Sequence, residues 1–183
     1  MSNMNAIEIS SPLKDDVIAE LKIGQKILLS GTIYTARDAA HKKIVEAMKN
    51  GENCAFDFWG QTIYYAGPCP AKPGWPIGPI GPTTSGRMDT YAPYLLQHGL
   101  KCMIGKGARS EAVKEAVVAN RAVYFAAIGG AAVVMMRCIK SAEVIAFDDL
   151  GPEAVRKLVV EKMPLFVAMD IHGEDIYAGR TIV

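Results

Sequence analysis

Three basic residues stand where a predicted strand gives way to a helix or a loop. Arg37 follows Thr35-Ala36, Arg87 closes the run Thr83-Thr84-Ser85-Gly86, and Lys106 lies between two glycines. Arginine can hold a carboxylate through two parallel hydrogen bonds, and each charged bond contributes about 1.5–3 kcal/mol. With the neighbouring hydroxyls, these side chains suit a small di- or tricarboxylate. Phosphate is the rival anion, and three ordinary solvated cations are the alternative without function.

The elements around these residues predict where they would meet. In open α/β sheets, ligands bind beyond the carboxyl ends of the strands. Helix N-termini add backbone donors and a partial positive charge there. A cation at the start of a helix is electrostatically disfavoured, so a basic residue at that position suggests that an anion compensates. We therefore expect Arg37, Arg87 and Lys106 to converge on one anionic ligand.

Hydrophobic periodicity predicts strands and helices that alternate along most of the chain, which is typical of an α/β fold with a mixed or partly parallel sheet. Thr35 and Asp38 resemble a helix capping box, Asn50-Gly51 a helix end, and Ser110 a helix cap. Strands are expected at residues 6–9, 25–35, 62–66, 100–104, 123–128, 143–147, 165–170 and 175–178. Helices are expected at residues 12–21, from 36 onward, at 88–98, after 110, at 131–139 and after 152.

Residues 67–87 are rich in proline and glycine, and five of the prolines recur at every third position. This repeat is typical of polyproline II structure. Neither flank looks like an independent unit, so we interpret the segment as an extended loop that shapes the pocket within a single domain over residues 1–183. The alternative is a peptide arm for the aromatic grooves of SH3 or WW domains.

Composition excludes several classes of protein. The 183 residues are 50% hydrophobic and 21% charged, which fits one globular domain and not a disordered chain. The net charge of +1 disfavours nucleic acid as the main partner. The longest uncharged run, residues 122–136, is shorter than a membrane-spanning helix requires. The N-terminus lacks the features of a signal peptide, so we expect a cytoplasmic protein with reduced thiols.

The cysteines and histidines show no spacing that is typical of a metal site. We therefore expect no metal on this chain, and we interpret Cys69, which lies beside the expected pocket, as an inert thiol. His41 lies one helical turn beyond Arg37 and could approach the same pocket, although a structural histidine is the alternative. The residues concerned are Cys54, Cys69, Cys102, Cys138, His41, His98 and His172.

Several motifs taken together resemble one family. They are Gly31-x-x-x-Thr35-Ala-Arg37-Asp38-x-Ala40-His41, Gly67-Pro68, Gly81-Pro82-Thr83-Thr84-Ser85-x-Arg87-Met88-Asp89, Gly105-Lys106-Gly107, Gly129-Gly130-Ala131-Ala132 and Gly151-Pro152-Glu153-Ala154. Over almost its whole length the chain is similar to the β subunit of class I iron–sulfur fumarate hydratases. The same module forms the C-terminal domain of single-chain members and the β subunit of L(+)-tartrate dehydratase.

The resemblance implies a hydro-lyase that reversibly adds water to fumarate to give malate. It implies a [4Fe–4S] cluster held by an α subunit and not by this chain. By resemblance, Arg37, Arg87 and Lys106 bind the substrate carboxylates and Thr83 is the catalytic base. The implied fold is the swivelling β/β/α domain. Residues expected around the site are Thr84, Ser85, His41 and Asp38.

The implied active site is divided between two chains. Threonine is a poor base alone, so Thr83 needs acidic or imidazole neighbours, which in this family the other subunit supplies. We therefore expect a hetero-oligomer or a homodimer that is inactive without the α subunit, with apolar surface reserved for the partner. Tartrate is the alternative substrate, and a non-catalytic anion- or partner-binding module is the alternative function.

Overall fold

The computed structural model describes residues 6–52 and 56–178, so Cys54 lies outside the described residues. The strands are β1 (Ile7–Ser11), β2 (Lys26–Thr35), β3 (Thr62–Tyr64), β4 (Ala66–Pro68), β5 (Ile80–Pro82), β6 (Cys102–Gly105), β7 (Val123–Ala126), β8 (Ile139–Ala146) and β9 (Val155–Met169). The helices are α1 (Asp15–Glu20), α2 (Asp38–Lys49), α3 (Ala92–Gln97), α4 (Glu111–Ala119) and α5 (Ala132–Arg137), with 3₁₀ helices η1 (Ser85–Met88) and η2 (Asp148–Glu153).

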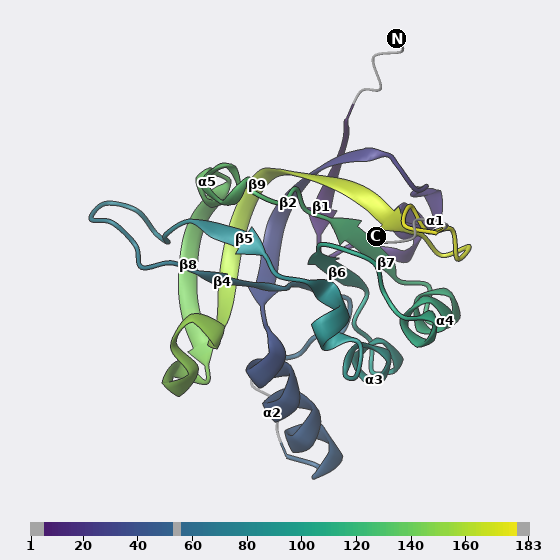
Figure 1. Cartoon of the computed structure of the whole chain (residues 1–183), viewed down its shortest axis with the longest axis horizontal. Coiled ribbons are helices and arrows are strands. Elements are labelled where there is room, and N and C mark those ends of the chain that lie inside the picture. The colour runs from purple at the N-terminus through teal and green to yellow at the C-terminus, as the bar shows by residue number, and fades with distance from the viewer. Residues whose placement is uncertain (1–5, 53–55, 179–183) are drawn as a thin grey trace.

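Seven strands form one mixed sheet in the order β1-β2-β3-β6-β7-β9-β8 (Figure 1). The first five strands of that order are parallel, whereas β9 runs antiparallel to its neighbours. Strand β9 also pairs with β2, so β2, β3, β6, β7 and β9 close into a ring. Because β2, β3, β6 and β7 are parallel, the loops that follow them emerge at the same edge of the sheet.

Two apolar cores hold this sheet in place. One contains buried side chains of β2, β6, β7 and β9 with α1 and α5. The other packs the sheet against α2, α3 and α4. Each of these three helices presents an apolar stripe to the sheet, for example Val113, Ala116 and Val117 of α4. The expectation of an α/β fold with a mixed sheet and flanking helices is confirmed.

The C-terminal third departs most from the sequence predictions. The expected strand at 165–170 forms the end of β9, a single strand of 15 residues whose first part takes the place of the expected helix after Pro152. Buried positions alternate from Leu158 to Val160 and again from Met163 to Val167, and the register shift opposite Leu29 and Gly31 interrupts the period-two pattern between them. The expected strand at 175–178 is also wrong. Only an isolated bridge joins Met169 to Asp175 among the described residues, because the Asp170 carboxylate accepts the nearby backbone N–H groups of His172 and Glu174.

The proline-rich segment contains a short hairpin. Strands β4 and β5 pair antiparallel, and the chain between them extends past α5 and β8 (Figure 1). The segment ends in η1, which carries Arg87, and the expected helix at 88–98 is shortened to α3. Within residues 6–52 and 56–178, no helix has the length and hydropathy needed to span a membrane.

Candidate active site

Arg37 lies at the N-terminus of α2, directly after β2. Its side chain is 23% exposed and packs close to Gly67 of the hairpin, where an added Cβ would come within 3.2 Å of the guanidinium and 2.8 Å of the Pro152 carbonyl oxygen. Glycine at position 67 therefore leaves room for Arg37 beside the hairpin. This contact fixes the arginine between the edge of the sheet and the start of the proline-rich segment.

One carboxylate connects the two arginines that the sequence placed apart. Asp38 Oδ1 lies 2.9 Å from Nε of Arg87, and Asp38 Oδ2 lies 3.7 Å from Nη2 of Arg37. The Asp38 side chain is 30% exposed, so the pair opens to solvent at this edge. Arg37 and Arg87 therefore both lie beside the Asp38 carboxylate, whereas their binding of one anionic ligand stays a prediction. The structure also shows that an internal carboxylate already neutralises part of their charge.

A second internal carboxylate, Glu153, explains how α2 begins with a cation. The backbone N–H of Ala39 donates to Glu153 Oε2 at 2.9 Å, and Glu153 Oε1 lies 3.5 Å from Arg37 Nη2. Glu153 therefore caps the helix from a distant part of the chain and compensates Arg37. The predicted capping box is wrong, because the Thr35 hydroxyl donates to the Ala154 carbonyl and accepts from the Arg156 N–H.

The segment 83–87 is tied to the loop after β6 by backbone contacts. The Thr83 N–H donates to the Tyr65 carbonyl at 2.8 Å, and the Ser85 N–H donates to the Lys106 carbonyl at 2.9 Å. Thr84 and Lys106 form an isolated parallel bridge. An added Cβ at Gly105 would overlap the Ser85 hydroxyl, so only glycine permits this approach. The structure thus brings Lys106 beside the segment that carries Thr83 and Arg87.

The site residues differ in exposure in a way that suits different roles. The Arg87 side chain is 52% exposed, and Lys106 is exposed, so a ligand can reach both basic residues from solvent. Thr84 is exposed as well. Thr83 is partly buried, whereas Ser85 is fully buried. From the sequence, Ser85 was expected among the residues around the site. Its burial shows that it faces the interior.

His41 belongs to the interior as well. Its side chain is fully buried, its Nδ1 lies 2.9 Å from the Arg37 carbonyl oxygen, and its ring packs edge-on against Tyr65. Burial lowers the pKa of His41 from 6.5 to about 4, because the charged form would lose its hydration. The imidazole is therefore neutral near pH 7, with Nδ1–H as the donor. His41 supports the backbone of Arg37 from behind the site.

The buried imidazole predicts a pH dependence of stability. Between pH 6.5 and 4 the unfolded chain binds a proton at His41 that the folded chain does not, so folding stability falls as the pH falls through this window. We expect His41→Gln to reduce the loss of unfolding free energy between pH 7 and pH 4.5 by about 2–3 kcal/mol. Urea denaturation at several pH values would measure this. Parallel pH curves for the two proteins would contradict it.

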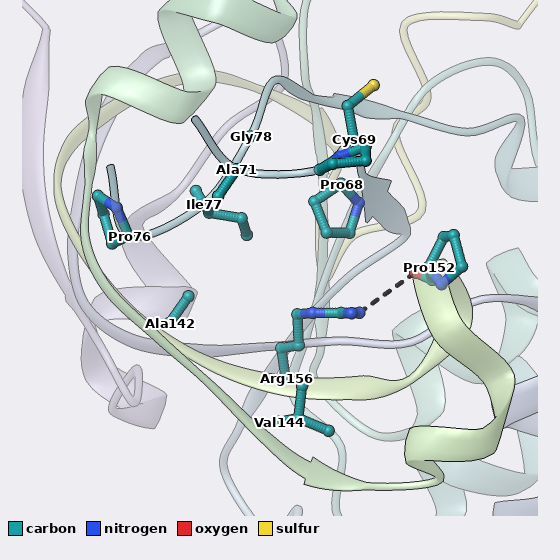
Figure 2. A pocket seen from close by; sticks show the side chains of 11 residues that line it. Pro68, Cys69, Ala71, Pro76, Ile77, Gly78, Ala142, Val144, Pro152 and Arg156 are labelled. Carbon is teal, nitrogen blue, oxygen red and sulfur yellow. Dashed lines mark hydrogen bonds between the residues drawn. The ribbon is translucent and has the colours of Figure 1, made fainter. Parts of the chain in front are cut away.

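The proline-rich segment lines a cavity, but a different one from the basic site. Its volume is about 380 Å³, and its lining is mainly apolar (Figure 2). Arg156 is the basic residue of its lining, and its guanidinium donates to the carbonyls of Gly151, Pro152 and Ala154. The Cys69 sulfur points away from Arg156 (Figure 2). The expectation that the segment shapes the pocket of Arg37, Arg87 and Lys106 is therefore not met at this cavity.

Comparison with known proteins gives this arrangement a family. The model of the family described as "Fumarase C-terminus" matches residues 1–180. The chain belongs to this family. Within it, the chain is 39% identical over 176 residues to "Fumarate hydratase class I, aerobic" of Escherichia coli K12, covering 93% of this chain and 32% of that protein. It is 39% identical over 163 residues to "Fumarate hydratase 2" of Leishmania major, covering 88% and 29%.

A further relative has nearly the same length as this member of the fumarase C-terminus family. It is the Methanocaldococcus jannaschii protein named "Putative L(+)-tartrate dehydratase subunit beta", 40% identical over 166 residues, covering 87% of this chain and 85% of that one. Fumarate hydratase and tartrate dehydratase are both names of hydro-lyases. The chain spans about a third of the length of the fumarate hydratases it matches.

The cysteines of this fumarase C-terminus chain do not fit an iron–sulfur cluster among the described residues. Cys102 is buried in β6, where burial raises the pKa of its thiol, while Cys69 is exposed on the hairpin and Cys138 follows α5. Cluster thiolates must converge on one point. The described residues also contain no group of three or more His, Cys, Asp or Glu that could hold a metal ion.

Sequence reasoning missed three residues that shape the site. Glu153 lies in the Gly151-Pro152-Glu153-Ala154 motif, and that motif is the one signal that marked it. No sequence pattern marked Tyr124, which lies in an expected strand, or Arg109, which lies in a loop without a polar pattern. Both are buried behind the segment 83–87.

Proposed function

We propose that this chain supplies the carboxylate-binding half of a hydro-lyase that hydrates fumarate to malate. The observation that carries the proposal is that Arg37 and Arg87 contact one carboxylate, that of Asp38. The place where an internal carboxylate is held by two guanidinium groups suits a substrate carboxylate equally well. Lys106, on the adjoining loop, adds a third positive charge. A dianionic C4 acid matches this arrangement better than a single small anion.

In this proposal each residue has a separate role. Arg87 and Lys106 are exposed and bind substrate carboxylates, and Arg37 holds the same anion from the start of α2. Thr83, at the partly buried start of the same segment, moves the proton. Asp38 and Glu153 compensate the arginines before the substrate arrives. Thr84 and Ser85 connect this segment to Lys106.

Several observations support a partner that completes the site. The described cysteines do not converge, and a threonine hydroxyl needs an acidic or imidazole neighbour to act as a base. Ile128, Val133 and Val134 are about half exposed, and α5 packs against β5, which leads into Thr83. Exposed apolar side chains beside a site are typical of a covered surface. We infer that an α subunit that holds a [4Fe–4S] cluster covers this face in a hetero-oligomer. The cluster would supply a Lewis acid for the hydroxyl group that is added to fumarate or removed from malate.

Tartrate dehydration is the second candidate. It is favoured by the Methanocaldococcus jannaschii relative, which this chain matches over 85% of that relative's length. Both substrates are C4 dicarboxylates, so the basic residues serve either of them. We further propose that residues 1–183 form one swivelling β/β/α domain. The support is a single seven-stranded sheet that includes both β1 and β9.

Reconstitution tests the proposed function. We expect the purified chain alone to show no hydratase activity, and to gain it when it is co-expressed anaerobically with a cysteine-bearing α subunit. The assay follows fumarate absorbance and, in parallel, tartrate consumption. Rapid turnover by the pure chain would overturn the divided site. A reconstituted complex that converts neither acid would overturn the hydro-lyase assignment.

A further inference from the structure

The loops that carry Arg87 and Lys106 share a buried hydroxyl. The Tyr124 oxygen lies 2.9 Å from Ser85 Oγ and 2.9 Å from the Gly107 carbonyl oxygen. A carbonyl can only accept, so Tyr124 donates its single proton to Gly107 and accepts from the Ser85 hydroxyl. Ser85 is two residues before Arg87, and Gly107 directly follows Lys106. Tyr124, in the middle of the sheet, therefore bonds to both loops at once.

The bonded state of this tyrosine does not change with pH in the working range. Tyr124 is fully buried, and burial raises the pKa of its hydroxyl well above its ordinary value of 10. The hydroxyl therefore keeps its proton. Ser85 is fully buried as well, and its backbone N–H donates to the Lys106 carbonyl at 2.9 Å. The two loops are thus joined through a side-chain bond and a backbone bond, both shielded from water.

A buried ion pair holds the tyrosine itself. The Arg109 side chain has no exposed surface, and its guanidinium carbon lies 5.0 Å from the centre of the Tyr124 ring and 5.3 Å from that of Tyr65. Arg109 Nε donates to Asp89 Oδ1 at 2.7 Å, and the Ser110 N–H donates to Asp89 Oδ2 at 2.6 Å. Asp89 directly follows η1, so this pair anchors the segment beyond Arg87 to the same cluster.

We propose that Tyr124 is a positioning residue whose hydroxyl, bonded to Ser85 and Gly107, sets the separation between Arg87 and Lys106. Arg109 packs against the Tyr124 ring and pairs with Asp89, and this pair holds the end of η1 next to the tyrosine. The side chains that face the substrate come from two different loops, and the distance between them is fixed from the interior. This inference rests on the proposed function for its kinetic consequence, whereas the bond between the loops stands on geometry alone.

The test variant is Tyr124→Phe, which removes the hydroxyl and keeps the ring on Arg109. In the chain alone, we expect hydrogen exchange of the Ser85 amide, measured by NMR, to accelerate about 3- to 10-fold or more, because the variant loses both buried hydrogen bonds of the hydroxyl. In the reconstituted enzyme, we expect the KM of the C4 substrate that the wild type turns over to rise about 3- to 10-fold, with kcat within about twofold.

A matched control comes from the neighbouring strand. Tyr64 in β3 is also fully buried, but its hydroxyl donates to the Ile80 carbonyl at 3.4 Å and, within the part of the chain that the structure describes, has no hydrogen bond to either loop. Tyr64→Phe should leave Ser85 exchange and KM at wild-type values. Ser85→Ala removes one of the two hydrogen bonds of the Tyr124 hydroxyl and should raise KM in the same direction as Tyr124→Phe. The double variant should show no increase beyond that of Tyr124→Phe, because Tyr124→Phe already lacks the bond between the two hydroxyls.

The outcomes separate the inference from the proposed function. Unchanged Ser85 exchange in Tyr124→Phe, or equal changes in Tyr64→Phe, would overturn the positioning role. A fall in kcat at constant KM would also overturn it, since loss of folded enzyme lowers the number of sites without altering those that remain. If the wild-type complex converts neither fumarate nor tartrate, the proposed function fails, and the exchange measurement still decides whether Tyr124 joins the loops.

Discussion

Replacing Arg87 with alanine is expected to lower kcat/KM for fumarate in the reconstituted enzyme by about 30-fold or more. Removing one partner of a desolvated, hydrogen-bonded charge pair costs about 2–5 kcal/mol, and each 1.4 kcal/mol is tenfold. Arg87 is half exposed in the chain alone, so this cost applies once substrate and partner cover it. The loss of its ion pair with Asp38 should change folding stability by less than about 1 kcal/mol. Steady-state kinetics and thermal unfolding would measure the two effects separately.

Two further variants sharpen the Arg87 prediction. Arg87→Lys keeps the charge but loses the fork that grips a carboxylate, so we expect it to recover only part of the activity. Arg121→Ala removes an exposed arginine that lies between α4 and β7, at the edge of the sheet opposite the loops that follow the parallel strands, and it should retain wild-type kinetics. An Arg87→Ala enzyme with unchanged kcat/KM would remove this residue from the site.

Replacing Thr83 with valine is expected to lower kcat by about 10²- to 10⁴-fold, the usual contribution of a positioned acid or base. Valine keeps the shape of threonine and removes the hydroxyl. The Thr83 backbone N–H, which donates to the Tyr65 carbonyl, is unaffected by the change. Because Arg37, Arg87 and Lys106 remain in place, KM should change little. Single-turnover measurements would show whether the proton-transfer step itself is slowed.

The Thr83 prediction has a conservative variant and a control. Thr83→Ser restores a hydroxyl and should recover most of the rate, which a role in packing alone would not explain. Thr90→Val makes the same chemical change at an exposed position beyond η1 and should be neutral. Equal kcat values for Thr83→Val and the wild type would exclude Thr83 as the group that moves the proton.

Local sequence patterns predicted the helix α2, the strand β2 and the end of α2 at Asn50-Gly51. They failed at β9, because the bulge near Lys162 breaks the alternation on which strand prediction depends. They also assigned the start of α2 to a capping box within four residues of sequence, Thr35 to Asp38. The helix is instead capped by Glu153, more than 100 residues away along the chain. Local patterns do not contain such long-range partners.

The sequence by itself predicted which residues make up the candidate site. Arg37, Arg87 and Lys106 were predicted to meet from their places after strands, since parallel strands end at one edge of a sheet. That reason holds for Arg37 after β2 and Lys106 after β6, whereas Arg87 follows the antiparallel hairpin of β4 and β5. The motifs also determined the family that the comparison confirmed. The alternation of strands with helices and the spacing of motifs are local properties of the sequence, so they can be read without coordinates.

Only the tertiary structure decided how the site is held and how its charge is balanced. Asp38 and Glu153 neutralise the arginines, His41 is buried and neutral, and Tyr124 bonds to the two loops from the interior. Each of these facts depends on the burial of a side chain and on a partner distant in sequence. Hydrogen bonds, ion pairs and desolvation act over a few ångströms in space, and the folded chain sets those distances.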